Sequence, residues 1–173
     1  LLLEGTSIVT ALADAGYRTI CIGGTGFFNP QTPLGTVLPS LFQESHFSRD
    51  MGVTSPVSAQ VQFSLARERL SEIPSTQRVF LFVNASATHP PTRIFQTEAK
   101  QESRKTQTAA LLHIDRHLPI LIDALRARGS AIGIVCSDHG TCFGEPGDDG
   151  NFGHRIAHPH VLTVPYAEFE VKA

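Results

Sequence analysis

The sequence predicts an α/β fold with a mostly parallel sheet and helices on both faces. Short apolar runs of strand length alternate with longer segments of helical periodicity along the chain. These runs are apolar almost throughout, as in parallel strands that helices cover on both faces. Hydrophobic residues make up 41% of the 173 residues and charged residues 17%, which suits one packed α/β domain over residues 1–173.

The first predicted elements are a helix and a strand. Residues 6–15 begin with hydroxyl side chains that can cap a helix and end before Gly16, which can terminate one. Residues 17–23 are β-branched and apolar, so a buried strand follows directly. The loop over residues 23–39 is rich in glycine and proline and predicts irregular backbone.

The middle of the chain predicts two helices around a second strand. Residues 57–73 place apolar side chains at helical spacing and end before a proline. Residues 78–84 form a continuous apolar run of strand length. Residues 103–128 have helical periodicity, and Pro119 is expected to kink or split that helix.

Two further strands are predicted near the end of the chain. Residues 131–136 form another apolar run, which we expect to be buried. Residues 161–169 predict a last strand, and because Pro165 interrupts it, that proline suits an edge strand or the beginning of a strand. Open parallel sheets bind ligands outside the carboxyl ends of their strands. The residues that follow Val83 and Val135 are therefore the first to examine for chemistry.

Charge and cysteine content narrow the classes of function. Fourteen basic against sixteen acidic residues give a net charge of −2, which disfavours nucleic acid and anionic membranes as partners. No apolar run is long enough for a membrane segment. Cys21, Cys136 and Cys142 are odd in number and widely spaced, which disfavours a disulfide framework and favours a cytoplasmic location. We expect Cys136 in the core and Cys142 nearer the surface.

The predicted strand at residues 131–136 leads into a candidate metal site. Asp138 and His139 place a carboxylate beside an imidazole, a pairing that suits Zn²⁺ or Mn²⁺, although an aspartate there could equally cap a helix. The glycine- and aspartate-rich loop over residues 144–150 can fold the later histidines back toward this pair. These histidines are His154, His158 and His160.

An ordered set of motifs resembles the alkaline phosphatase/sulfatase superfamily. Residues 136–145, with Cys-Ser-Asp-His-Gly at their start, resemble the metal-site end of that superfamily, as do the later Gly153-His154 and Val164-Pro165-Tyr166. Residues 11–19 and 114–125 resemble other segments of sulfatases. The resemblance implies an alkaline-phosphatase-like, three-layer α/β/α domain, of which this chain is the carboxyl-terminal part without the nucleophile segment.

The resemblance also implies roles for single residues. Asp138 and His139 become metal ligands, and His154 becomes a further ligand or an anion contact. His89 matches a histidine that touches the transferred group, which implies a catalytic and substrate-binding role; otherwise it caps local backbone. We assign His158 to substrate binding, but metal ligation and a supporting or packing role stay open for both His158 and His160.

Two other features are weaker candidates. His113 and His117 have the i, i+4 spacing of a metal pair, but helical geometry points them away from the sheet, so we interpret them as solvated. Residues 23–26, Gly-Gly-Thr-Gly, suggest a phosphate loop but lack the third glycine of a dinucleotide fingerprint and the lysine of a P-loop. A nucleotide-binding module is therefore a minor alternative.

The resemblance implies a metal-dependent hydrolase or transferase of small-molecule phosphate or sulfate esters. The cofactor would be a divalent ion, Zn²⁺ or Mn²⁺ before Ca²⁺ or Mg²⁺. The first carboxylate ligand and the nucleophile would precede Leu1, so we expect this chain alone to be inactive. The alternative is a non-catalytic metal- or anion-binding domain that keeps the fold. The sequence does not indicate an oligomeric state.

Overall fold

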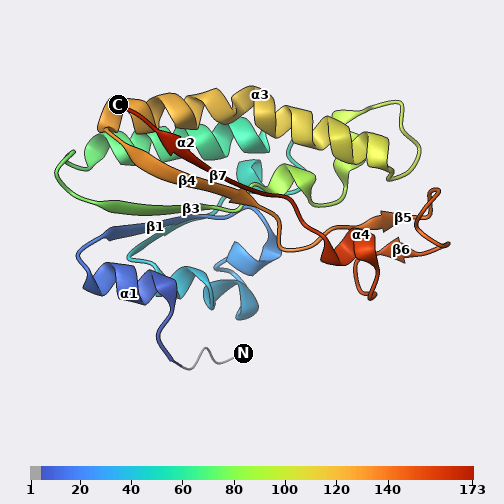
Figure 1. Cartoon of the computed structure of the whole chain (residues 1–173), viewed down its shortest axis with the longest axis horizontal. Coiled ribbons are helices and arrows are strands. Elements are labelled where there is room, and N and C mark those ends of the chain that lie inside the picture. The colour runs from blue at the N-terminus through green and yellow to red at the C-terminus, as the bar shows by residue number, and fades with distance from the viewer. Residues whose placement is uncertain (1–4) are drawn as a thin grey trace.

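The computed structural model describes residues 5–173, so the first four residues of the expected domain lie outside it. Figure 1 shows a small mixed α/β arrangement with a hairpin at one end. Its helices are α1 (Ile8–Asp14), α2 (Ser58–Glu72), α3 (Arg104–Arg128) and α4 (Pro159–Leu162). Its strands are β1 (Arg18–Ile22), β2 (Glu44–His46), β3 (Val79–Val83), β4 (Ala131–Cys136), β5 (Cys142–Phe143), β6 (Phe152–Gly153) and β7 (Tyr166–Val171).

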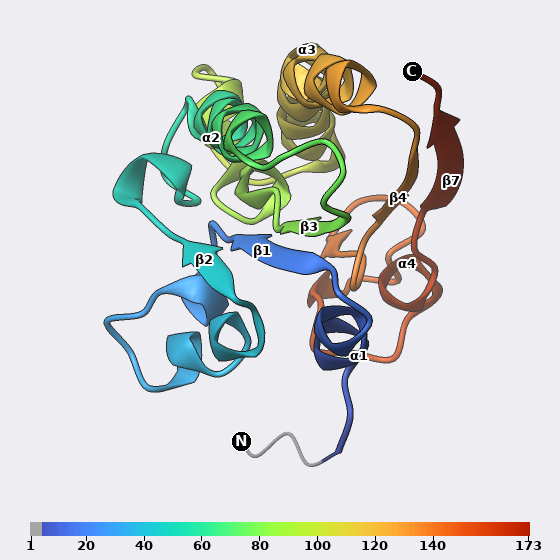
Figure 2. The same cartoon turned by 90° about the vertical axis from the view of Figure 1, so that its left-hand side faces the viewer.

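The central sheet is parallel, with strand order β2-β1-β3. Ile22 at the end of β1 is in register with His46 on β2 and Val83 on β3, so the three carboxyl ends share one edge. Helix α1 lies on one side of this sheet, and α2 and α3 lie on the other (Figure 2). The structure therefore confirms the predicted parallel sheet, although the sheet has three strands only.

The expected three-layer core is not seen in the described residues. Strand β4 stays outside the central sheet and pairs antiparallel with β7, while β5 and β6 form a separate hairpin. As a result Ile132 and Ile134 are 74% and 57% exposed, and the prediction of a buried strand at β4 is wrong. An apolar run predicts burial only where other layers cover it, and here β7 is the partner that β4 has.

The core forms where α2 packs on the central sheet. The buried cluster consists of Ile20 and Ile22 on β1, Met51 in the segment before α2, and Ala66 on α2. Flanking apolar side chains pack around it. Ala66 is fully buried, so the helix backbone comes close to the sheet. This packing holds the carboxyl ends of β1 and β3 at a rigid edge.

Helix α2 also braces the loop that follows β3. The buried Gln62 donates to the carbonyl of Asn84 at 2.6 Å and accepts from the backbone N–H of Ser86 at 3.3 Å. The Ser86 hydroxyl in turn donates to the carbonyl of Met51 at 2.6 Å. The loop that leads to His89 is therefore tied to both the helix and the core.

The remaining helices differ from the sequence expectation in detail. Helix α3 begins at a capping box on Ser103 and continues through Pro119 to Arg128, so the proline does not split it. The strand expected over residues 161–169 is confirmed only after Pro165, where β7 begins; its first residues belong instead to α4, which Pro159 begins. Strand β2 was not predicted, because three residues inside a loop carry no periodic signal.

Candidate metal centre at the strand ends

Asp138 and His139 follow β4 and present two ligand atoms side by side. Asp138 Oδ2 lies 3.7 Å from His139 Nε2, while its Oδ1 accepts from the His139 backbone N–H at 3.1 Å. The His139 ring donates from Nδ1 to the carbonyl of Gly140 at 2.9 Å, which leaves the Nε2 lone pair free. A carboxylate oxygen and an imidazole nitrogen are thus close enough to share one ion.

His154 joins this pair from the strand β6 side. Its ring stacks on the His139 ring with centroids 4.2 Å apart and an interplanar angle of 19°. Desolvation lowers the pKa of His154, and the positive charges of His139, Arg155 and His89 lower it further. The structure therefore brings His154 to His139 and favours its neutral, ligand-competent form.

His89 approaches the same group from the end of β3. It ends the short turn Ser86–Thr88, and its ring donates from Nδ1 to the carbonyl of Pro90 at 2.8 Å. Its charge contributes to the lowered pKa of His154, so the two rings interact electrostatically. The catalytic and substrate-binding role of His89 stays a prediction.

The glycine-rich loop after β1, residues 23–26, uses its backbone donors for contacts within the protein. The backbone N–H groups of Gly24 and Thr25 point to Asn84 Oδ1 at 3.4 and 3.2 Å. A Cβ atom at Gly23 would overlap the side chain of Phe28, which packs against that position. Because a phosphate cradle needs free backbone donors, this loop does not support the nucleotide-binding alternative.

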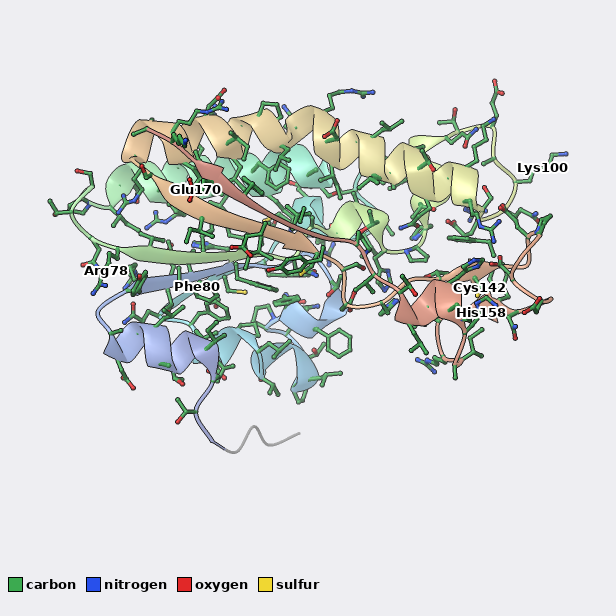
Figure 3. The ribbon with its side chains drawn as sticks, in the orientation of Figure 1. Arg78, Phe80, Lys100, Cys142, His158 and Glu170 are labelled. Carbon is green, nitrogen blue, oxygen red and sulfur yellow. The ribbon has the colours of Figure 1, made fainter. Side chains whose placement is uncertain are left out.

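His158 and His160 lie in a different group. One ring nitrogen of each and the thiol of Cys142 all lie within 4.8 Å of one another, and this is the group of three possible ligands found among residues 5–173. Figure 3 labels Cys142 and His158, which lie together near the β5–β6 hairpin. The ligand atoms of Asp138, His139 and His154 are not all within this distance of one another. The assignment of His158 to substrate binding stays a prediction, and its ring is buried beside Cys142.

Burial corrects three further expectations. Cys142 is buried and Cys136 is exposed, the reverse of what we expected, because β4 lies outside the central sheet and Cys142, on β5, packs against the buried His158. His113 is buried rather than solvated, since the turn Thr92–Phe95 covers that side of α3 and Phe95 stacks on its ring at 4.5 Å. Burial lowers the pKa of His113.

Two solved structures share this fold. Both are crystal structures of the C-terminal periplasmic domain of EcEptC from Escherichia coli, one of them in complex with Zn. The TM-scores are 0.73 and 0.72 at 14% sequence identity, over 99% of this chain in each case. At this identity the likeness shows the fold alone. Neither a protein-family model nor a curated protein matches the sequence.

The comparison also bears on size and location. The chain spans about half of the two solved domains, 53% and 52% of their length. Both are described as periplasmic, which contradicts the cytoplasmic location that we expected from the unpaired cysteines. Within residues 5–173, no helix combines the length and hydropathy that a membrane crossing requires.

Proposed function

We propose that this chain is part of a metal-dependent hydrolase or transferase that acts on phosphate or sulfate esters. The observation that carries the proposal is the placement of Asp138 and His139 after β4, with the His154 ring stacked on His139. The fold likeness to a domain crystallised with Zn supports it. Because the chain spans half of that domain, the proposal concerns the protein of which this chain is a part.

The donor set fits a divalent ion. Asp138 offers Oδ2 and His139 offers Nε2, and the hydrogen bond from His139 Nδ1 to Gly140 holds the ring in that tautomer. His154 would supply a second imidazole. Mixed oxygen and nitrogen ligands suit Zn²⁺ or Mn²⁺. When bound, such an ion supplies Lewis-acid stabilisation of charge on ester oxygens.

His89 would bind the transferred group. Its Nδ1 donates to the carbonyl of Pro90, so Nε2 is the ring nitrogen left for the ester. A proton on Nε2 would be donated to a non-bridging or leaving oxygen of the ester. The braced loop after β3 would hold the ring in place, through the contacts of Ser86 with Gln62 and Met51.

A non-catalytic metal- or anion-binding domain is the second candidate. One observation favours it: the Asp138 side chain is 89% exposed, so this ligand is open to water rather than enclosed in a catalytic cleft. For either function we place the protein outside the cytoplasm, as the periplasmic neighbours suggest.

The test combines binding with turnover. The purified chain would be titrated with Mn²⁺ and Zn²⁺, and the full-length protein would be assayed with chromogenic phosphate monoesters, phosphate diesters and sulfate esters. Asp138→Ala and His154→Ala should weaken the binding of the first Mn²⁺ by at least about tenfold. Asp115→Ala, which removes an exposed aspartate on α3, is the matched control.

The outcomes separate the two candidates. Turnover that Asp138→Ala abolishes would support the enzyme. Binding without turnover, in this chain and in the longer protein that contains it, would favour the non-catalytic domain. Full activity in Asp138→Ala would refute both the ligand assignment and the mechanism.

A further inference from the structure

A second cluster of ligand atoms lies beyond the proposed centre, where the β5–β6 hairpin meets α4. We propose that Cys142, His158 and His160 bind a Zn²⁺ ion of their own. Their ligand atoms lie within 4.8 Å of one another, and Cys142 Sγ is 3.3 Å from His158 Nδ1. Ligands of a tetrahedral zinc ion lie about 3.3 to 3.6 Å apart, given the usual Zn–S and Zn–N lengths. A small movement of these three side chains toward one another would therefore give their ligand atoms the spacing found around zinc.

The hydrogen bonds show which nitrogen of each ring would face an ion: Nε2 of His160 keeps its lone pair, and His158 would use Nδ1 in place of the hydrogen bonds that it accepts there. His160 donates from Nδ1 to Asp148 Oδ1 at 2.7 Å, so its Nε2 keeps a lone pair. His158 Nδ1 accepts from the backbone N–H of His160 at 3.1 Å, so its hydrogen is on Nε2, which lies 3.5 Å from Asp149 Oδ2. His160 is thus hydrogen-bonded to a carboxylate, the arrangement that orients histidine ligands around zinc, and the exposed carboxylate of Asp149 lies near the other nitrogen of His158.

Asp148 is held more firmly than a surface carboxylate would be. It is fully buried, and its Oδ2 accepts from the backbone N–H groups of Phe143 and Glu145 at 2.8 and 3.0 Å. Arg104 on α3 donates to its Oδ1 at 2.5 Å. These bonds fix the carboxylate that orients His160, so the outer shell of the site exists before any ion binds.

The loop and the burial of the cluster fit the same interpretation. Gly147 has φ +90°, and a Cβ atom added there would lie 3.3 Å from Cε1 of His160, so a larger residue would crowd that ring. Cys142 and His158 are buried, whereas the His160 side chain is 46% exposed. An ion can therefore enter on the His160 side and bind in a site whose other ligands are shielded from water.

Binding replaces a proton with the ion. In the metal-free protein the Cys142 thiol contacts the same Nδ1 lone pair of His158 that the ion would use. Zn²⁺ would take the thiolate form, and the thiol proton would pass to solvent. One thiolate and two imidazoles form a borderline-soft donor set, which distinguishes this site from the oxygen-containing set at Asp138 and His139. The inference does not depend on the proposed function.

The test uses Co²⁺ as a spectroscopic substitute for Zn²⁺ in the full, reduced chain. We expect a thiolate-to-cobalt charge-transfer band that saturates at one ion and disappears when Zn²⁺ is added. Cys142→Ser should abolish the band, and Cys136→Ser, which removes an exposed thiol, is the matched control that should keep it. His160→Gln changes a half-exposed side chain and should weaken Co²⁺ binding at least about tenfold with unchanged circular dichroism.

The outcomes are decisive in both directions. The proposal is overturned if the wild-type chain gives no band in excess Co²⁺, or if the band survives Cys142→Ser or disappears in Cys136→Ser. Should Cys142→Ser fail to fold, unchanged affinity in the folded His160→Gln variant would overturn it equally. Asp138→Ala should keep the band, so failure of the proposed ester chemistry and failure of this second site are distinguishable.

Discussion

Glu44 carries an ion-pair network whose loss should be measurable as a pH-dependent change in stability. It lies on β2 with its side chain 12% exposed, and it accepts hydrogen bonds from Arg18 on β1 and Arg69 on α2 at 2.9 and 2.6 Å. Burial alone would raise the pKa of Glu44, but hydrogen bonds from His46, Arg18 and Arg69 outweigh it and lower the pKa to about 2. The perturbation is Glu44→Gln, which keeps the shape and removes the charge.

The direction of the shift fixes the pH window. A carboxylate whose pKa falls from 4.5 to about 2 on folding stabilises the folded state above pH 4.5 and loses that contribution as the pH falls toward 2. The shift corresponds to about 3 kcal/mol, and solvent screening of the partly exposed arginines reduces it to about 1–2 kcal/mol. We expect Glu44→Gln to lower the free energy of unfolding by that amount at pH 7.

The assay is urea unfolding followed by circular dichroism at pH 7 and pH 3. The difference between wild type and Glu44→Gln should shrink to less than half at pH 3. Asp123→Asn removes the exposed pair with Arg126 on α3 and should change stability by no more than about 0.5 kcal/mol at either pH. Equal stability of Glu44→Gln and wild type at pH 7, or a difference that does not shrink at pH 3, would refute the reasoning.

Three further predictions test the core, the thiols and the second metal site. Ile20→Ala should lower the free energy of unfolding by about 2–5 kcal/mol and the exposed Ile134→Thr by no more than about 0.5 kcal/mol, both by urea titration; equal costs would contradict the described burial. A disulfide reagent should label Cys136 quickly and Cys21 only on unfolding, because burial raises the pKa of Cys21 to about 12; rapid labelling of two thiols would count against this. Asp148→Asn should weaken Co²⁺ binding about 10–100-fold in the charge-transfer titration, and unchanged affinity would show that Asp148 does not orient His160.

The sequence predicted those helices and strands that can be recognised from their own residues. The predicted strand over residues 131–136 coincides with β4, and those over residues 17–23 and 78–84 enclose β1 and β3, because apolar β-branched runs between turn residues are recognisable without their partners. Helices α2 and α3 begin and end within a residue or two of prediction, since caps and helical spacing are also local. β2 was missed for the opposite reason: its three residues are held by pairing with β1.

The candidate centre was predictable in part. Asp138 and His139 are adjacent in sequence at the end of a strand, so their proximity follows from local geometry. The approach of His154 needed the hairpin between them to fold back, which the glycine-rich loop suggested and the stacked rings of His139 and His154 show. The cluster around Cys142 was not predicted, although the spacing of Cys142, His158 and His160 was visible, because nothing in the sequence indicated that the thiol is buried.

The sequence by itself determined an α/β chain with a parallel sheet, the positions of most helices and strands, and a carboxylate–imidazole pair after β4. Tertiary structure alone decided which apolar runs are buried and which polar groups meet. β4 is as apolar as β1, yet Ile134 is exposed while Ile20 is buried, because α2 packs on β1 and no helix or strand among residues 5–173 covers Ile134 in the same way. Burial and the distances between ligand atoms depend on contacts between residues that are far apart in sequence, and these contacts form only when the chain folds.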